Sequence, residues 1–262
     1  GMVASVAWAA RIVPDSGARR VAIHGCCMLG ALPAARATQA ARARPRPARP
    51  LVLPAPLPDV IRSRLRARVE AAIPPLHGWT SVDKGARLAE LVVATDARRS
   101  VELGVFGGRG TISLAIGHEA LGRGEVFAID PWERAASLEG VNAPENDEWW
   151  GKLDHEMIYQ SFMRAIAESG VERWCRVLRM RSAEAVHDIP DGSIDVLHQD
   201  SNHSEAISTA EVEQWTPKLA PGGLWIADDT DWPTTQRAQA RLAELGFGVV
   251  EDHKGWKVFH RR

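Results

Sequence analysis

The sequence predicts an α/β fold in which helices cover both faces of a mostly parallel, seven-stranded sheet with an antiparallel last strand. From residue 100 onward, short runs rich in Val, Ile and Leu alternate with amphipathic segments of helical periodicity. This alternation is typical of strand and helix units in a parallel sheet. Only Lys254-Gly255 separates the last two apolar runs, and a connection that short joins antiparallel strands.

Each element follows from the spacing of its apolar residues. Two amphipathic helices are expected before the sheet, over residues 59–73 and 84–93, because apolar side chains recur there every three or four positions. In chain order we then expect a strand at 100–104, a helix at 110–121, a strand at 125–130, a helix at 154–169, strands at 176–180 and 194–200, a helix at 205–218, a strand at 223–228, a helix at 234–245, and strands at 247–252 and 256–260.

Composition excludes several classes of protein. The chain of 262 residues is 45% hydrophobic and 25% charged with a formal net charge of -1, which is typical of a globular protein. No apolar run approaches the ~20 residues of a membrane span, so no membrane partner is expected. The three cysteines, Cys26, Cys27 and Cys175, are odd in number and have no metal-ligand spacing. We therefore expect a reducing, cytoplasmic location and no structural zinc.

Residues 1–58 are expected to form an extension, and residues 59–262 the folded domain. The extension has eight arginines, no lysine and one acid, which give it a net charge of +7. Its many prolines fix φ and remove backbone donors, so a regular helix or strand is not expected there. Three interpretations stay open: an extension without chemistry, an export signal near Arg19-Arg20, and a basic arm that binds nucleic acid or another acidic surface.

A glycine-rich turn after the first predicted strand indicates a nucleoside-containing cofactor. It runs over residues 102–110 (ELGVFGGRG) into a helix, where missing side chains let a ligand approach the backbone. Asp130 ends the next strand, where its carboxylate can accept hydrogen bonds from ribose hydroxyls. Because ligands of open parallel sheets lie beyond the strand ends, the predicted cofactor contacts are Glu102, Gly104, Gly107, Gly108, Asp130 and Ser182.

NAD and S-adenosylmethionine both suit this geometry, and the sequence favours the second. The only tyrosine, Tyr159, is followed four residues later by Met163 instead of the lysine of a short-chain dehydrogenase. The carboxylate of Glu102 would repel a pyrophosphate. It suits the free amino group and the positive sulfonium of S-adenosylmethionine.

Five segments of the chain carry a family resemblance. They are residues 81–85 (SVDKG), 101–108 (VELGVFGG), 127–131 (FAIDP), 194–203 (IDVLHQDSNH) and 221–229 (PGGLWIADD). In this order the chain resembles the class I S-adenosylmethionine-dependent O-methyltransferases, particularly the small-molecule branch with the catechol and macrolide-sugar enzymes. The resemblance covers about residues 78–262. It implies a Rossmann-like fold and methyl transfer to a hydroxyl of a small molecule, with a sugar or a polyketide-type natural product as candidate acceptors.

The resemblance also implies a Mg²⁺ or Mn²⁺ site formed by Asp200, Asp228 and Asp229 at the ends of the fourth and fifth strands. Oxygen ligands without cysteine or clustered histidine favour these ions over zinc. Three carboxylates at a cofactor pocket would raise one another's pKa unless a cation lay among them. The alternative is that Asp228 caps the following helix and Asp229 is merely solvated.

The resembling enzymes place a lysine or histidine base three residues after the fourth-strand acid, which makes His203 and Asp200 the predicted catalytic residues. A neutral imidazole can remove the proton of an acceptor hydroxyl. The alternative is a helix-start histidine bonded to solvent. His198, in the fourth strand, is expected to be a packed core histidine, and Arg109 a surface residue.

The irregular stretch from residue 131 to 155 predicts a lid over the acceptor site. Its Trp149-Trp150 pair would stack on a sugar or an aromatic ring, or would close the loop by apolar contact alone. Trp232 is another candidate wall. The amine-methylating signature of Asp or Asn, two prolines and an aromatic is absent after the fourth strand, so nucleic-acid amine methylation is disfavoured.

Two alternative functions remain open on the sequence. One is a metal-independent methyltransferase in which the aspartates are structural. The other is a cofactor-binding protein without turnover. The motifs do not determine the oligomeric state, and a homo-oligomer is compatible with them.

Overall fold

The computed structural model describes residues 55–261. The first helix, α1, begins at Asp59, and nearly all of the extension assigned to residues 1–58 lies outside the described residues. That assignment therefore stays a prediction, as do the cytoplasmic location and the oligomeric state. None of the helices between residues 55 and 261 combines the length and the apolar character that crossing a membrane requires.

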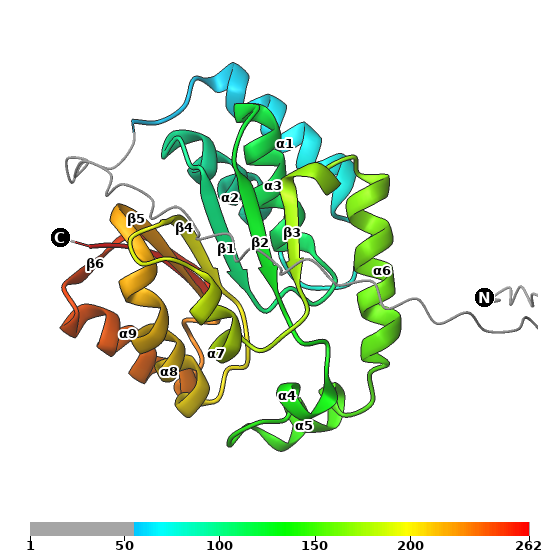
Figure 1. The fold of residues 1–262 in the computed structure, drawn as a ribbon, viewed down its shortest axis with the longest axis vertical. Coiled ribbons are helices and arrows are strands. Elements are labelled where there is room, and N and C mark those ends of the chain that lie inside the picture. Colours follow the sequence, from blue (N-terminus) through cyan, green and yellow to red (C-terminus); the bar gives the residue numbers. More distant parts are fainter. Residues whose placement is uncertain (1–54, 262) are drawn as a thin grey trace, which may run out of the picture. The chain divides into compact units, whose positions relative to one another are not determined.

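The seven strands form one sheet in the order β3-β2-β1-β4-β5-β7-β6 (Figure 1). Strand β7 is antiparallel to both of its neighbours, and the other pairs are parallel. This confirms the predicted mixed sheet. The chain order reverses between β1 and β4, which makes this position the switch point where ligands of such sheets bind. The strands are β1 (Arg99–Leu103), β2 (Glu125–Ile129), β3 (Cys175–Leu178), β4 (Ile194–Gln199), β5 (Leu219–Asp228), β6 (Phe247–His253) and β7 (Trp256–Arg261).

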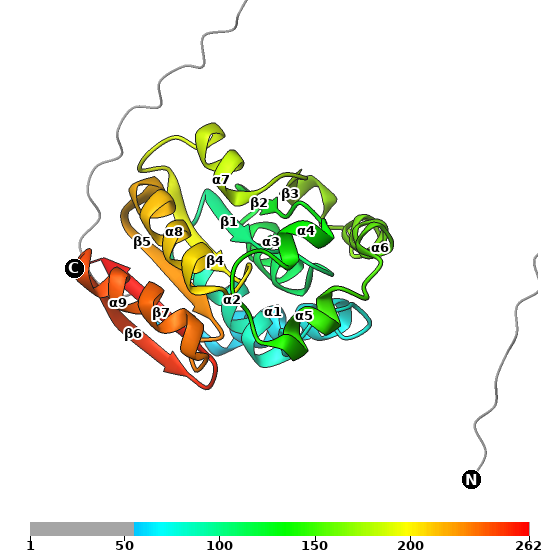
Figure 2. The same ribbon diagram turned by 90° about the horizontal axis from the view of Figure 1, so that it is seen from below.

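Helices cover both faces of the sheet, as Figures 1 and 2 show. One face carries α1 (Asp59–Ala72), α2 (Val82–Ala94), α3 (Arg109–Leu121) and α6 (His155–Glu168). The other face carries α7 (Ser182–Ala185), α8 (Glu205–Trp215) and α9 (Gln236–Glu244). Short 3-10 turns lie at Glu172–Trp174, Val186–Asp188, Thr216–Lys218 and Pro233–Thr235.

Successive strand residues point to opposite faces and so enter two separate cores. In β1, Val101 belongs to the core under α8 and α9. Its neighbour Glu102 points to the face of α2 and α3, where it contacts Thr111 of α3. In β5, Ile226 belongs to the core of this same face. Asp228, two residues further, therefore points toward α2. This alternation places the side chains of Glu102 and Asp228 on the same face of the sheet.

The stretch predicted to be irregular contains two short helices, α4 (Arg134–Ser137) and α5 (Pro144–Trp150). Proline at the first position of α5 and the acids Glu145 and Asp147 in its first turn favour a helix start. The two helices lie beyond the carboxyl ends of the strands, at the bottom of Figure 1. They are therefore positioned over the edge where the cavity opens.

Helix α2 packs closely on α3 because both contain glycine at the contact. A Cβ at Gly85 would lie 2.6 Å from Ser113 Oγ, and a Cβ at Gly117 would lie 2.6 Å from Val92 Cβ. Ser81 caps α2 by accepting a hydrogen bond from the Lys84 backbone N–H. The first turn of α2 is thereby fixed against the sheet.

His118 is a fully buried histidine of α3. Its Nε2 lies 2.9 Å from Ser100 Oγ, and its Nδ1 lies 3.1 Å from the Arg123 carbonyl oxygen. Because a carbonyl oxygen only accepts, Nδ1 carries the proton and Nε2 accepts from the Ser100 hydroxyl. Burial lowers the pKa of His118 from 6.5 to about 4.

Acidification should destabilise the fold through His118. Above pH 6.5 the ring is neutral in the folded and the unfolded chain, so the free energy of unfolding does not depend on its ionisation there. As the pH falls toward 4, the unfolded chain binds a proton that the folded chain does not, and the free energy of unfolding should drop by about 3 kcal/mol. Urea unfolding of the full chain across this pH range measures the loss. His118→Asn is the control, because its amide can donate to the Arg123 carbonyl without titrating. Equal losses in both proteins would contradict the prediction.

Candidate active site

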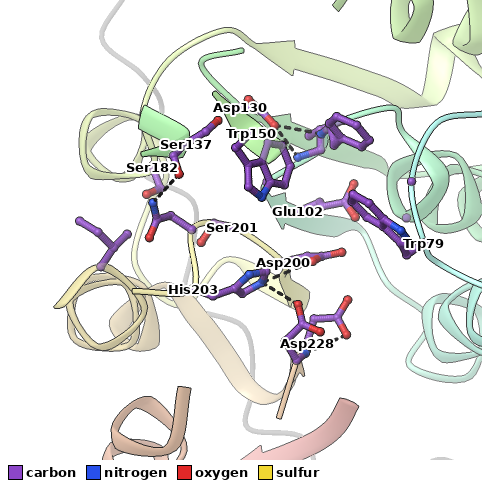
Figure 3. A pocket seen from close by; sticks show the side chains of 18 of the residues that line it. Trp79, Glu102, Asp130, Ser137, Trp150, Ser182, Asp200, Ser201, His203 and Asp228 are labelled. Atoms are coloured by element: carbon purple, nitrogen blue, oxygen red, sulfur yellow. Dashed lines mark hydrogen bonds and ion pairs between the residues drawn. The ribbon is translucent and has the colours of Figure 1, made fainter. Parts of the chain in front are cut away.

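A cavity of about 990 Å³ opens at the carboxyl edge of the sheet. The ends of β1, β2, β4 and β5 form its floor, and α4 and α5 contribute to its wall. Figure 3 shows Asp130 and Glu102 on one side of it and Asp200, His203 and Asp228 on the other. The cavity thus joins the predicted cofactor residues and the predicted acceptor residues in one space.

The glycines of the turn after β1 are required by contacts within the protein. Gly104 has φ 81°, and a Cβ there would overlap the carbonyl oxygen of Asp200. Gly108 has φ 90°, and its Cβ would overlap the Phe162 ring. Gly104 lines the cavity, whereas Gly107 and Gly108 pack against His77 and Phe162. The space beside Gly107 and Gly108 is filled by protein atoms, and the contact of all three glycines with a cofactor stays a prediction.

Asp130 organises this turn. Its Oδ2 accepts hydrogen bonds from the backbone N–H groups of Val105 and Phe106, both at 2.9 Å. Its Oδ1 accepts one from the Trp132 N–H at 2.7 Å. Burial raises the pKa of Asp130, although these three bonds favour the ionised form. Asp130 also lines the cavity, and a carboxylate oxygen with one donor can accept another.

Glu102 and His198 form a buried pair behind the turn. They are directly opposite each other in the β1 and β4 register, and His198 Nδ1 lies 2.8 Å from Glu102 Oε1. The other oxygen of Glu102 accepts from the Thr111 hydroxyl. Glu102 is 1% exposed and His198 is fully buried, as expected for a core histidine. Both oxygens of Glu102 are therefore engaged within the protein, and its contact with a cofactor amino group stays a prediction.

Asp200, His203 and Asp229 come together at the cavity. One ligand atom from each lies within 4.8 Å of the others. His203 Nε2 is 3.0 Å from Asp229 Oδ2 and 3.9 Å from Asp200 Oδ1, and it has no hydrogen-bond partner among the described residues. Burial and the neighbouring Asp228 carboxylate raise the pKa of Asp200 well above its usual range.

Asp228 lies beside Asp200 and also pairs with a lysine. Its Oδ2 makes an ion pair with Lys84 Nζ of α2, and its Oδ1 accepts from the Asp229 backbone N–H at 3.0 Å. The alternative in which Asp228 caps the next helix is therefore not what the structure shows. Asp229 adopts φ 48°, which turns the chain so that the two neighbouring aspartates face different partners. The geometry groups His203 with Asp200 and Asp229, and Asp228 contacts the same group through Asp200.

Ser182 belongs to a polar network that sequence reasoning missed. Its hydroxyl donates to Glu211 Oε1 at 2.6 Å. Glu211 Oε2 accepts from Ser201 Oγ at 2.5 Å and from Gln199 Nε2 at 3.0 Å. Glu211 is buried, and burial raises its pKa. The signal was present in α8, because Glu211 lies on the buried stripe that also includes Ser208, Val212 and Trp215.

Arg109 is not the surface residue that was expected. Its guanidinium donates to the carbonyl oxygens of Leu76 at 2.9 Å, Pro74 at 3.0 Å and Thr80 at 3.2 Å. The guanidinium has five N–H donors in a fixed plane, so an arginine can donate to several carbonyl oxygens at once. Arg109 thereby ties the segment before α2 to the start of α3.

Aromatic rings cover one side of the cavity. Trp79 stacks on Phe106 with 5.6 Å between ring centroids, and Trp149 lies 4.8 Å from Trp79. Trp150 contacts Phe106 edge-on at 5.2 Å. Trp79 is 69% exposed, which is unusual for a tryptophan. The predicted lid tryptophans therefore contact two rings, Trp79 and Phe106, that the sequence analysis did not identify. Trp232 lies beside His203, on the opposite side of the cavity.

The fold and a family match indicate the kind of domain that this chain contains. Residues 101–230 match the model of a family described as a methyltransferase domain. The strand order, with its antiparallel seventh strand, is the arrangement predicted for this class. Residues 101–230 thus match a methyltransferase domain family, within a chain that has the Rossmann-like fold predicted for the class I S-adenosylmethionine-dependent methyltransferases.

Individual proteins resemble the chain over different lengths. The structure of the O-methyltransferase NovP aligns with a TM-score of 0.57 at 14% identity, over 78% of this chain and 97% of that chain. The SAH-bound methyltransferase PaMTH1 from Podospora anserina aligns with a TM-score of 0.52 at 12% identity, over 79% and 89%. Both likenesses concern the fold. The uncharacterized protein y4gI of Sinorhizobium fredii (strain NBRC 101917 / NGR234) is 33% identical over 163 residues, which are 61% of this chain but only 15% of that protein's length.

Proposed function

We propose that the protein transfers the methyl group of S-adenosylmethionine to a hydroxyl of a small molecule, with a divalent cation held by Asp200 and Asp229. One observation carries the proposal: the group of Asp200, His203 and Asp229 opens into the same cavity as Gly104 and Asp130. A donor and an acceptor held in one cavity can react as neighbours. A volume near 990 Å³ is at the upper end for small-molecule sites and suits two ligands.

The residues present fit a Mg²⁺ or Mn²⁺ ion. Two carboxylates supply hard oxygen ligands, and their donor atoms lie within 4.8 Å of each other and of the His203 ring nitrogen. When bound, such a cation lowers the pKa of an acceptor hydroxyl. Asp200 and Asp229 would hold the ion, with Asp228 beside them.

His203 would remove the proton in this reaction. Its Nε2 lies at the cavity, 3.0 Å from Asp229 Oδ2, where a neutral imidazole can take the proton of an acceptor oxygen. The acceptor oxygen forms a bond to the methyl carbon while the bond from that carbon to sulfur breaks. The hydroxyl proton passes to His203, and the thioether S-adenosylhomocysteine leaves.

The acceptor side of the cavity supports a small molecule with an apolar or ring-shaped face. Trp79, Phe106, Trp149 and Trp150 present their rings there, and such rings stack on sugars and aromatic groups. We infer a sugar or a polyketide-type natural product as the acceptor class. A metal-independent methyltransferase is the second candidate, because Lys84 already places a positive charge among the aspartates.

Chelation distinguishes the two candidates. Methyl transfer to a panel of hydroxylated small molecules should fall by at least about 100-fold in EDTA and return with added Mg²⁺ or Mn²⁺, because the ion supplies several kcal/mol to the reaction. Calorimetry should show that S-adenosylhomocysteine binds equally well in EDTA. Full activity in EDTA would favour the metal-independent enzyme. Cofactor binding with no transfer across the panel would favour a binding protein without turnover.

A further inference from the structure

Asn202 connects the loop of residues 200–204 to the lid, which is formed by residues 134–150. It lies in the loop after β4, one position before His203. Its Nδ2 lies 2.9 Å from the Glu139 carbonyl oxygen, 3.1 Å from that of Ala136 and 3.2 Å from that of Ser137. Figure 3 shows Ser137 and His203 around the same cavity. The loop that carries the proposed base is therefore bonded to the segment that covers the cavity.

The Asn202 amide caps the carboxyl end of α4. Its three acceptors lie in and just after the last turn of that helix, where the final carbonyl groups have no partner within the helix. Three acceptors fix the orientation of the amide, because its nitrogen and not its oxygen must face them. The amide oxygen accepts from the Ser204 backbone N–H at 2.8 Å, directly before α8. One side chain thus holds both the lid and the loop.

Gly140 makes a second contact between the lid and the loop. It adopts φ 85°, and a Cβ there would lie 2.4 Å from Ser204 Oγ. Ser204 is 1% exposed, so its side chain has little room to move away. The lid backbone approaches the loop this closely because residue 140 has no side chain.

The order of the lid depends on such contacts. Helix α4 has four residues, none of them buried, and α5 has seven. Helices of these lengths are not stable on their own. Trp149 and Trp150 hold α5 against Trp79 and Phe106, whereas Asn202 holds the end of α4. Loss of the Asn202 bonds should therefore release the α4 part of the lid.

His203 lies between two residues whose positions are fixed. Asn202 is bonded to the lid, and Ser204 is buried at the start of α8. The His203 ring lies 3.0 Å from Asp229 Oδ2 and 5.0 Å from Trp232, measured between ring centroids. A movement of Asn202 would move the adjoining backbone of His203. Displacing a reacting group by about 1 Å is enough to lower a rate strongly.

We propose that Asn202 is a positioning residue that couples closure of the lid to the placement of His203. In the closed lid its amide has three acceptors, and in an open lid it loses all of them, so the loop is free to shift. The inference rests on the proposed function, in which His203 takes the proton of the acceptor. It adds that the base is in place only when the cavity is covered.

Hydrogen–deuterium exchange of the full chain, without ligands, tests the contact with the lid. Asn202→Asp keeps the oxygen that accepts from Ser204 but turns a carboxylate toward three carbonyl oxygens. Amides of residues 134–150 should exchange about tenfold or more faster, because the lid opens more often. Glu139→Ala is the matched control: it removes an exposed ion pair with Arg181, keeps the carbonyl group and should change nothing. Unchanged exchange in a folded Asn202→Asp protein would overturn the proposal.

The reciprocal measurement disturbs the contact from the lid and observes the loop. In Gly140→Ala the new Cβ meets Ser204, so amides of residues 201–208 should exchange at least about threefold faster, since coupling between two elements acts in both directions. Gly170→Ala is the matched control, because Gly170 has a similar φ of 72° but open space around it. Faster exchange in the lid alone contradicts the coupling. Gly140→Ala also decides the question if Asn202→Asp does not fold.

Kinetics show whether Asn202 acts through His203. At saturating acceptor, Asn202→Asp should lower kcat for methyl transfer about tenfold or more. In a His203→Ala background the same change should lower kcat no further, because the base that Asn202 places is already missing. Equal losses in both backgrounds, or a higher KM with unchanged kcat, would overturn the role in placing His203.

These outcomes are separate from those that test the proposed function. Faster exchange of the lid in Asn202→Asp and of the loop in Gly140→Ala, without methyl transfer to any acceptor, would support the coupling and overturn the proposed function. Methyl transfer together with unchanged exchange in both variants would overturn the coupling alone. S-adenosylhomocysteine binding, measured by calorimetry on the same samples, shows whether the cofactor half of the cavity is intact.

Discussion

Replacing His203 by alanine should lower kcat for methyl transfer by roughly 10²–10⁴-fold, the usual contribution of a general base. The reason is geometric: Nε2 lies beside Asp200 and Asp229 at the cavity and has no hydrogen-bond partner among residues 55–261. The affinity for S-adenosylhomocysteine should stay the same, because the ring is on the acceptor side. Steady-state kinetics and calorimetry measure the two quantities.

The acidity of the acceptor provides a sharper test of His203. Acceptors whose hydroxyl is already acidic need less help with the proton, so the loss in His203→Ala should shrink for them. His253→Ala is the matched control, because that histidine pairs with Glu251 away from the aspartates and should leave kcat unchanged. Equal losses for acidic and non-acidic acceptors would show a positioning role instead, and a fully active variant would remove His203 from the mechanism.

Replacing Asp130 by alanine should weaken cofactor binding by roughly 2–4 kcal/mol, the scale of two charge-assisted hydrogen bonds to ribose hydroxyls. The same change removes the acceptor of three backbone N–H groups that shape the turn. Calorimetry with S-adenosylhomocysteine measures the affinity. Glu139→Ala is the matched control, since Glu139 lines the same cavity but pairs with Arg181, and its affinity should not change.

The two roles of Asp130 can be separated by a second substitution. Asp130→Asn keeps one oxygen acceptor for the turn, so it should melt closer to the unmodified chain than Asp130→Ala does while still losing cofactor affinity. Differential scanning calorimetry without cofactor measures the melting temperatures. A folded Asp130→Ala protein that binds S-adenosylhomocysteine as tightly as the unmodified chain would contradict the assignment.

Strand periodicity made the fold predictable, because period-two and helical patterns are local properties of the sequence. The strand ends at Asp130, Asp200 and Asp228 followed from the same patterns, and all three line the cavity. The pairing of Glu102 with His198 did not follow, because it depends on the register of two strands far apart in the chain. That register is set by packing and not by either segment alone.

Lys84 and Glu211 are two buried charged residues whose partners could not be predicted from the sequence. Both are charged residues on the buried stripe of an amphipathic helix, Lys84 four residues before Leu88 and Glu211 four before Trp215. A charge at such a position requires a partner, which the helical pattern signals but cannot identify. The short helix α5 was missed for another reason, since seven residues carry too little periodicity to be recognised.

Gly104 contacts the Asp200 backbone at the edge of the sheet, where the proposed reaction takes place, whereas the proposed acceptor is bound mainly by other parts of the chain. The two residues directly follow the adjacent strands β1 and β4, so in the proposed reaction the spacing of the sheet sets the path of the methyl group. Three of the rings on the proposed acceptor side, Trp79, Trp149 and Trp150, are carried by α5 and by the segment before α2, outside the sheet. If the proposed function holds, exchanging these two segments should change the acceptor preference and leave the spacing of the strand ends unchanged.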